Sequence, residues 1–410
     1  RQPAPRRLMS HGNRRTAPAS PRARLTPLLL GALLRGGSSY SPWVDSEEDP
    51  RPPTELADLT PRLGVTALWS TEIGAGTDGR RLSLVPAVDG ARLFVADAQG
   101  LVTALSTGDG RVLWQRETGI PFSGGPGVAG QRLILGSTDG DLVALSTTDG
   151  SQLWRAGVDS EILAIPRIAG ETVVLHTLND DVLGFDAASG ELRWRYSSQA
   201  PVLTLRGSST PVIAGEHAVV GVSGGKLVKL ELATGLPEWE TTVTPPRGRS
   251  ELERIADLDA TPVLAEGVLY ACAYNGDLAA VDLASGSVLW RRELSAHAGL
   301  AAADGVLYIT DSDDQVWAAQ PGDGAGIWKQ EALRYRDLTA PALAGDWLVV
   351  GDFEGYLHWL SRRDGSIVAR LEVADGPIRA RPVVAGGRVF VYGDDGTVAA
   401  LTYGGSPARR

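Results

Sequence analysis

Cysteine is almost absent from this chain of 410 residues, in which Cys272 is the single example. One cysteine rules out a disulfide bond within the chain and a metal site built from several thiolates. Because Cys272 falls in a predicted strand, we expect it to be a small buried hydrophobic residue. Long apolar runs are also missing, and no stretch has the roughly 20 apolar residues that a membrane-spanning helix needs.

Acidic residues are absent from the first 40 positions, which hold eight of the 39 lysines and arginines. Residues 41–410 therefore carry 31 basic and 49 acidic side chains, so the body of the protein is acidic. A phosphate backbone would be repelled by such a surface, which argues against nucleic acid as the main partner.

The basic N-terminal segment 1–40 has the order of an export signal. Four arginines between positions 14 and 24 precede the apolar stretch 28–34, and small residues occupy positions 36–39. This order predicts a secretory signal peptide, and a disordered basic tail is the alternative. Residues 41–60 contain several prolines and acidic residues, and they predict an extended linker.

Glycine is abundant, with 50 residues, and six Asp-Gly, Ser-Gly or Thr-Gly pairs place their glycine four positions before a tryptophan. In a seventh copy of the pattern, Gly365 precedes Ala369 at the same spacing. The six pairs are Gly110 and Trp114, Gly150 and Trp154, Gly190 and Trp194, Gly235 and Trp239, Gly286 and Trp290, and Gly324 and Trp328. Successive tryptophans of this set are 40, 40, 45, 51 and 38 residues apart. A repeat of about 40 residues made of short strands is typical of a β-propeller with one blade per repeat.

One repeat, residues 260–290, illustrates the predicted blade. Strands are expected at 261–264, 268–273, 278–283 and 287–290, and Asn275 and Gly276 are expected to form the tight hairpin turn between the middle strands. A four-stranded sheet cannot bury both faces alone, so neighbouring blades must stack. The outer-strand tryptophan is therefore predicted to pack between blades, and a ligand-stacking role is the less favoured alternative.

Eight repeats can be counted, with inner strands that start near residues 84, 124, 163, 209, 260, 299, 340 and 380. The last repeat has three strands and lacks its tryptophan strand, whereas an unpaired strand with Trp69 lies at 67–71. Pairing these two ends would close the ring and remove exposed edges. We predict an all-β, eight-bladed β-propeller over residues 61–403, followed by a disordered tail at 404–410. The predicted blade-packing residues are Trp69, Trp114, Trp154, Trp194, Trp239, Trp290 and Trp328.

The 45- and 51-residue steps place extra chain in two neighbouring connections, each from an outer strand to the next inner strand. These connections emerge on one face, and extra length on one side of a repeat array usually marks a binding surface. We predict an apolar contact region with charges around it. The alternative is that the leucines pack under their own loop and the charges are solvated. The predicted partner-binding residues are Leu203, Leu205, Arg206, Arg249, Leu252, Asp257 and Asp259.

No catalytic residue, cofactor site or metal site is predicted. The histidines at 176, 217, 297 and 358 fall in different repeats and lack metal-ligand spacing. The acidic run at 311–314 occupies a hairpin turn and lacks the distal Glu of a calcium loop, so we interpret it as a turn. The spaced glycines at 74–79 are not followed by a predicted helix, which argues against a phosphate-binding loop.

Several longer segments carry a resemblance to a known family. The pattern Asp/Ser-Gly-x-x-x-Trp is shared by all PQQ-like propellers, whereas five segments are more specific: DLTP (58–61), WSTEIG (69–74), LRGSSTP (205–211), PRGRSELER (246–254) and GDFEGYLH (351–358). With them, the chain resembles the BamB family of outer-membrane protein assembly factors from about Trp43 to Tyr403.

The resemblance implies a non-catalytic periplasmic scaffold at the inner face of the Gram-negative outer membrane. It implies that the two long loops dock the barrel-forming subunit BamA through its POTRA domains, and unfolded outer-membrane proteins are a further candidate partner. Family members usually carry a lipidated Cys at the end of the signal. Gly37 stands at that position here and has no thiol to acylate, which puts lipid anchoring in doubt.

Two alternative functions remain open at this point. A PQQ-dependent dehydrogenase would share the blade repeat, but those enzymes are longer and typically have a vicinal Cys pair over the cofactor. A sensor or adhesion propeller would be joined to another module, and none is recognisable in the sequence.

Overall fold

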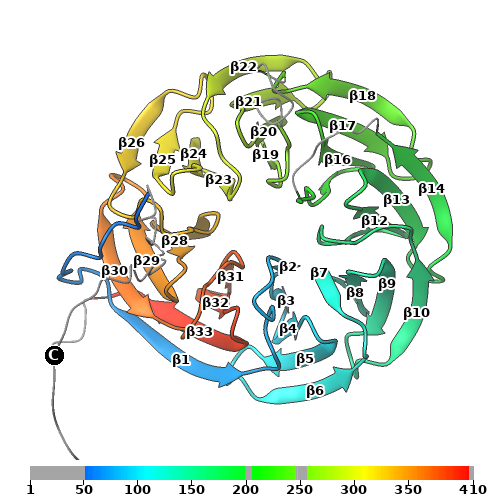
Figure 1. Ribbon diagram of the computed structural model, residues 1–410, viewed down its shortest axis with the longest axis horizontal. Coiled ribbons are helices and arrows are strands. Elements are labelled where there is room, and N and C mark those ends of the chain that lie inside the picture. Colours follow the sequence, from blue (N-terminus) through cyan, green and yellow to red (C-terminus); the bar gives the residue numbers. More distant parts are fainter. Residues whose placement is uncertain (1–50, 199–205, 246, 248–255, 406–410) are drawn as a thin grey trace, which may run out of the picture. The chain divides into compact units, whose positions relative to one another are not determined.

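Each repeat of about 40 residues folds into one antiparallel sheet, and eight such sheets surround a common centre as the blades of a propeller (Figure 1). The structure, a computed structural model, describes residues 51–198, 206–245, 247 and 256–405. We number the blades in the chain order of their innermost strands. The predicted all-β, eight-bladed fold is confirmed.

Blades 1 to 4 follow one another along the chain. Blade 1 contains β3 (Ala87–Asp89), β4 (Arg92–Ala96), β5 (Leu101–Ser106) and β6 (Val112–Glu117); blade 2 contains β7 (Phe122–Ala129), β8 (Arg132–Ser137), β9 (Asp141–Ser146) and β10 (Gln152–Gly157); blade 3 contains β11 (Arg167–Ala169), β12 (Thr172–His176), β13 (Asp181–Asp186) and β14 (Leu192–Ser197); blade 4 contains β15 (Val212–Ala214), β16 (His217–Val222), β17 (Lys226–Glu231) and β18 (Pro237–Thr242). The two-residue strand β2 (Ser83–Leu84) pairs in parallel with β7 and adds a fifth strand to blade 2.

Blades 5 to 8 complete the ring. Blade 5 contains β19 (Val263–Ala265), β20 (Val268–Cys272), β21 (Asp277–Asp282) and β22 (Val288–Glu293); blade 6 contains β23 (Gly299–Ala303), β24 (Val306–Thr310), β25 (Val316–Ala319) and β26 (Gly326–Gln330); blade 7 contains β27 (Ala342–Ala344), β28 (Trp347–Gly351), β29 (Tyr356–Ser361) and β30 (Ile367–Glu372); blade 8 contains β31 (Val383–Ala385), β32 (Arg388–Tyr392), β33 (Thr397–Tyr403) and β1 (Val65–Glu72).

The predicted hairpin of blade 5 is present, and only one of its two turn residues has positive φ. Asn275 adopts the left-handed conformation, with φ of 50°, whereas Gly276 is not among the residues with positive φ. An added Cβ on Gly276 would lie 2.7 Å from the side chain of Thr244. Gly276 is therefore needed because of this close approach, and Asn supplies the left-handed residue that its short polar side chain tolerates.

Strand β1 closes the ring, as the sequence predicts. It pairs antiparallel with β33, so that Val65 faces Tyr403 and Glu72 faces Thr397. Figure 1 shows the N-terminal strand beside the C-terminal one at the rim of the ring. Trp69 contacts Phe390 of the same blade, with ring centroids 6.3 Å apart. One blade is thus built from both ends of the chain, and no free edge remains on β33.

All seven outer-strand tryptophans pack between blades. Each indole Nε1 donates a hydrogen bond of 2.8–3.2 Å to a backbone carbonyl of the next blade. The acceptors for Trp69, Trp114, Trp154, Trp194, Trp239, Trp290 and Trp328 are Thr107, Thr147, Ala187, Leu232, Leu283, Pro321 and Arg362. The repeat glycine of the next blade lies against the same ring: a Cβ on Gly110 would come within 2.6 Å of Trp69. The repeated Gly and Trp positions are therefore explained by contacts between neighbouring blades, in which the Trp of one blade packs on the Gly of the next.

Blade 7 lacks the outer tryptophan because the large residue stands on the third strand of the blade and the small residue on the outer strand, the reverse of the other blades. In the other blades the outer Trp faces a residue of the adjacent strand that is usually Ala or Gly, as Trp114 faces Ala104. In blade 7, Trp359 on β29 faces Ala369 on β30. Trp359 is fully buried in one hydrophobic cluster with Leu63, which enters from the segment before β1. The exchange keeps the core filled and makes room for that segment.

Candidate functional site

Two long connections between blades leave neighbouring outer strands on the same face. Residues 198–211 join β14 to β15, and residues 243–262 join β18 to β19. Their described parts rest on a polar layer, in which His176 Nδ1 lies 3.0 Å from the carbonyl oxygen of Ser209 and Nε2 lies 3.1 Å from Asp180 Oδ1. These contacts anchor the base of the first loop to blade 3.

Arg206 is an exposed cation in a fixed position on this face. Its side chain is 45% exposed, and its Nη2 lies 2.5 Å from Glu161 Oε1. Its Nη1 also donates a hydrogen bond of 2.8 Å to the carbonyl oxygen of Arg81, which belongs to the connection between β1 and β3. The guanidinium is therefore held by two other connections before any partner binds.

Asp257, a predicted partner-binding residue, is a structural residue instead. It is only 3% exposed, and its Oδ1 accepts a hydrogen bond of 3.2 Å from the backbone N–H of Gly224 in the neighbouring hairpin. A carboxylate in this place fixes the loop end to blade 4 and cannot present its charge to a partner. Sequence position alone did not show this, because the acceptor role depends on a turn 33 residues away.

Asp259 is half-buried, and its carboxyl group lies beside Gly207 of the other long loop. Burial raises the pKa of Asp259 to about 7, and the nearby carboxylate of Asp257 adds to the shift. The charge at this position therefore changes near neutral pH, and Asp259 connects the two loops at their bases.

We expect Asp259→Asn to stabilise the fold at pH 8 and to leave it nearly unchanged at pH 4. The folded pKa lies above the unfolded value, so the stability that the protonated Asp259 contributes is complete below about pH 4 and is lost as the pH rises through 7. The gain at pH 8 should be roughly 1 kcal/mol or more in urea unfolding.

Asp186→Asn is the matched control, because hydrogen bonds from the backbone and hydroxyl of Ser189 lower the pKa of Asp186 to about 2. That variant should be less stable than the wild type by an amount that grows between pH 2 and pH 4 and then stays constant up to pH 8. A stability difference for Asp259→Asn that does not change between pH 4 and 8 would contradict the assignment.

Four predicted contact residues, Leu203, Leu205, Arg249 and Leu252, lie outside the described residues. The described part adds three residues that the sequence reasoning missed. These are Glu161 and Arg81, which hold Arg206, and Arg247, whose Nη2 lies 2.9 Å from the buried carboxylate of Asp277. Only the PRGRSELER segment, which contains Arg247, carried a signal in the sequence.

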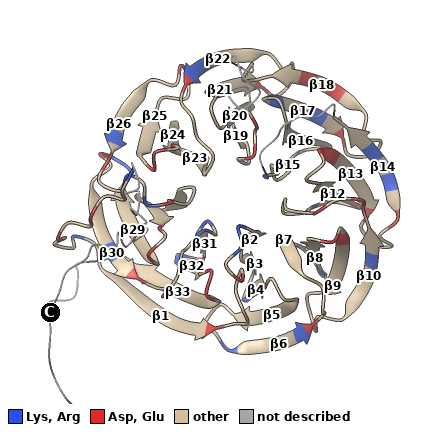
Figure 2. Cartoon of the chain, in the orientation of Figure 1, with Lys and Arg blue, Asp and Glu red and all other residues tan. Residues whose placement is uncertain are grey.

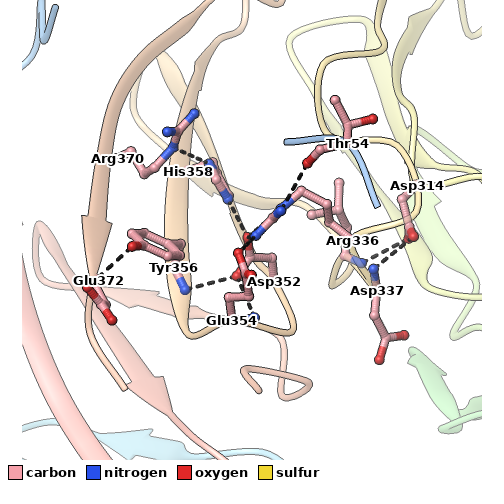
Figure 3. A network of polar contacts seen from close by, with 12 residues as sticks. Thr54, Asp314, Arg336, Asp337, Asp352, Glu354, Tyr356, His358, Arg370 and Glu372 are labelled. Carbon is pink, nitrogen blue, oxygen red and sulfur yellow. Dashed lines mark hydrogen bonds and ion pairs between the residues drawn. The ribbon is translucent and has the colours of Figure 1, made fainter. Parts of the chain in front are cut away.

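A second charged cluster lies between blade 7 and the segment that precedes β1, residues 51–64 (Figure 3). Asp352 Oδ2 accepts hydrogen bonds of 2.9 Å from Arg336 Nε and from His358 Nε2. Arg336 Nη1 donates to the carbonyl oxygen of Thr54 at 3.0 Å, and Arg370 Nε lies 3.3 Å from His358 Nδ1. Both His358 and Asp352 are fully buried, so this His–Asp pair has no access to a substrate and serves as a structural connection.

The acidic run at 311–314 forms a hairpin turn, as predicted. Asp311 Oδ1 accepts hydrogen bonds of 2.9 and 2.8 Å from the backbone N–H groups of Asp313 and Gln315. Across the part of the chain that the structure describes, no group of three or more His, Cys, Asp and Glu side chains is arranged to hold a metal ion. None of the described residues forms a helix long and apolar enough to cross a membrane.

Comparison with known proteins identifies the family. A family model described as outer membrane protein assembly factor BamB matches residues 56–119, 98–330 and 332–404, which is nearly the whole propeller. The chain belongs to the BamB family. The outer membrane protein assembly factor BamB of Pseudomonas aeruginosa is 47% identical over 351 residues, which cover 86% of this chain and 92% of that protein. BamB of Alkalilimnicola ehrlichii is 50% identical over 347 residues, or 85% of this chain and 91% of that protein.

A solved structure of the same family has the same fold. The crystal structure of BamB from Moraxella catarrhalis superposes with a TM-score of 0.76 at 27% identity, and the match covers 82% of this chain and 99% of that one. The predicted resemblance is therefore confirmed, and the protein is a non-catalytic assembly factor for outer membrane proteins. The dehydrogenase alternative from the sequence is set aside on this family assignment.

Proposed function

We propose that the protein docks a BamA-like barrel protein, through the periplasmic POTRA domains of that partner, with the face that carries the two long loops. Membership of the BamB family makes the chain a component of outer-membrane protein assembly at the periplasmic side of the outer membrane. Unfolded outer-membrane proteins are a further candidate partner. Residues 1–40 would direct export, and Gly37 would leave the exported chain without an acyl group.

The observation that carries the proposal is the held but exposed side chain of Arg206. A cation that Glu161 and the Arg81 carbonyl already position loses little conformational freedom when a partner carboxylate binds it. An Arg in the middle of an apolar contact region is a common hot spot. Leu203 and Leu205 precede it by one to three positions, and Arg249 and Leu252 belong to the neighbouring loop.

The docking set is revised by one residue relative to the sequence prediction. Asp257 is left out because it is buried. Asp259 stays in the set as a half-buried group at the base of both loops, whose charge adjusts the position of the loops. The apolar contacts would then come from the leucines and the orientation from Arg206.

Arg206→Glu tests the proposal. The variant should weaken binding to the purified POTRA region of the partner by about 2 kcal/mol or more, which is roughly a 30-fold rise in Kd. Leu205→Asp should have a similar effect. The melting temperature should change little, because the ion pair of Arg206 with Glu161 is partly exposed and such pairs contribute little to stability.

Arg155→Glu is the matched control for charge reversal. Arg155 is 50% exposed and forms an ion pair of 2.7 Å with Asp141, but it lies on the outer strand β10. The control should bind the POTRA region normally. Equal affinities of Arg206→Glu and the wild type would place the docking surface elsewhere, and a fall in melting temperature together with affinity would make Arg206 a structural residue.

A further inference from the structure

The centre of the ring contains a cavity of about 870 Å³ that receives residues from all eight blades. Its wall is built from the innermost strands and the residues just before them. Seven of these eight segments carry a proline at the same place: Pro86, Pro126, Pro166, Pro211, Pro262, Pro341 and Pro382. Proline suits an inner edge because it has no N–H group that would remain unpaired there.

The residues on either side of these prolines give the wall its chemistry. Those that line the cavity are small, apolar or hydroxyl-bearing at nearly every position: Val85, Ala87, Ile165, Thr210, Thr261, Ala340, Ala342 and Val383. Two positions differ, namely Arg167, directly after Pro166 in blade 3, and Arg381, directly before Pro382 in blade 8. Two cations thus stand in a wall that offers few other polar groups.

Arg167 and Arg381 have no ion-pair or hydrogen-bond partner among the residues that the structure describes, in contrast to the other arginines of the cavity. Arg81 forms an ion pair of 3.0 Å with Asp337, and Arg379 forms one of 3.2 Å with the same carboxylate. Arg206 pairs with Glu161. The three paired arginines belong to the connections on the docking face, so the unpaired charge is confined to the inner wall.

The two free arginines are exposed to the cavity, with no carboxylate of the described residues beside them. The protein around the cavity lowers the pKa of Arg167 and of Arg381 by reducing their solvation. An anion in the cavity would restore the lost solvation, and its attraction is stronger beside an apolar wall than in bulk water.

The charge balance of the cavity is opposite to that of the whole protein. Its lining contains five arginines and two aspartates, Asp259 and Asp337, whereas the chain has a net charge of −10. Figure 2 shows basic segments next to β2 and β31 on the inner side of the ring. A concave site with charge opposite to the rest of the surface concentrates ligands of the complementary sign.

We propose that the central cavity binds a small molecule with at least two separate anionic groups, either carboxylates or phosphates. The two groups would be bound by Arg167 and Arg381, which belong to non-adjacent blades, so a single-centre anion would engage only one of them. The apolar wall between them would contact the body of the ligand. The cavity shares Arg206 and Asp259 with the docking face, but the two proposed anion contacts lie on the inner wall and do not depend on the proposed partner.

Calorimetric titration of the full chain at low salt tests the site, with citrate as the carboxylate probe and tripolyphosphate as the phosphate probe. We expect saturable binding of at least one probe with one site per chain, and which probe binds more tightly identifies the anionic group. Arg167→Gln and Arg381→Gln should each weaken that binding by about 10-fold or more, the scale of one charge-assisted hydrogen bond. Acetate, with one anionic group, should bind at least about 10-fold more weakly.

Arg111→Gln is the control, since Arg111 is exposed on the turn between β5 and β6 and does not line the cavity. It should bind the probe as tightly as the wild type. Thermal melting of each variant checks that the ring is intact. The proposal is overturned if neither probe binds at millimolar concentration, or if the folded cavity variants bind as the wild type and Arg111→Gln do.

Discussion

A chain that begins at residue 74, and so lacks strand β1, is expected to be destabilised by more than the 3–5 kcal/mol that a single buried Trp→Ala change costs. The deletion removes Trp69 together with its hydrogen bond to Thr107 and its contact with Phe390. It also removes the whole antiparallel ladder between β1 and β33 and exposes a strand edge in a closed ring. The measurement is the free energy of unfolding in urea.

A chain that begins at residue 65 is the control, because it keeps β1 but lacks the preceding segment that packs on blade 7. Comparison of the two chains separates the contribution of the closing strand from that of residues 51–64. If both chains unfold at the same urea concentration, β1 does not close the ring in solution. Trp69→Ala in the full chain should lie between the full-length protein and the longer deletion.

The blade repeat and the ring closure were predictable from the sequence because they depend on local patterns that recur. Glycine turns, strand lengths and the position of Trp114 or Trp154 repeat at a nearly constant period. The exchange in blade 7 also had a signal in the sequence that was overlooked. Trp359 precedes Ala369 by ten residues, the same spacing by which Ala104 precedes Trp114.

Other features depend on contacts between distant segments and have no local signal. The burial of Asp257 follows from an N–H group of Gly224, and the position of Arg206 follows from Glu161 and Arg81. Residues 51–60 belong to the segment 41–60 that composition predicts to be an extended linker, and Arg370 of blade 7 donates a hydrogen bond to the carbonyl oxygen of Ala57. Composition indicates that a segment is extended when nothing contacts it, but it does not show that the segment packs against another part of the same chain.

The largest effect of a single substitution is expected from Asp352→Ala in the cluster of Figure 3. Asp352 and Arg336 form an ion pair of 2.8 Å with side chains that are 0% and 3% exposed. Burial alone would raise the pKa of Asp352, but the hydrogen bond from His358 and the nearby charges outweigh it, and the pKa is lowered. The carboxylate is therefore ionised in the folded protein and balances the buried guanidinium.

Removal of this carboxylate leaves Arg336 Nε and the His358 Nε2–H group without their acceptor, and only Glu354, which is half exposed, remains as a carboxylate partner of Arg336 among the described residues. Breaking a buried ion pair in this way costs about 3–5 kcal/mol. Arg336 also donates a hydrogen bond to the carbonyl oxygen of Thr54, and Arg370 donates one to that of Ala57. Residues 51–64 should therefore detach from blade 7 at the same time. Urea unfolding and amide exchange of residues 54–63 would measure the two effects.

Asp311→Ala is the control variant, because Asp352 both pairs with Arg336 and supports a hairpin turn, whereas Asp311 supports an equivalent turn without an ion pair. Asp352 Oδ1 accepts hydrogen bonds of 3.0 Å from the N–H groups of Glu354 and Tyr356, and Asp311 makes the equivalent turn bonds in blade 6. Asp311 also accepts a hydrogen bond from Trp317 Nε1, but it balances no buried arginine. Asp352→Ala should therefore be the more destabilising variant by at least about 2 kcal/mol, since charged groups left unpaired cost more than neutral ones. Equal losses in the two variants would mean that the turn bonds alone account for the effect, and that the Arg336 charge finds solvent or another acceptor when Asp352 is removed.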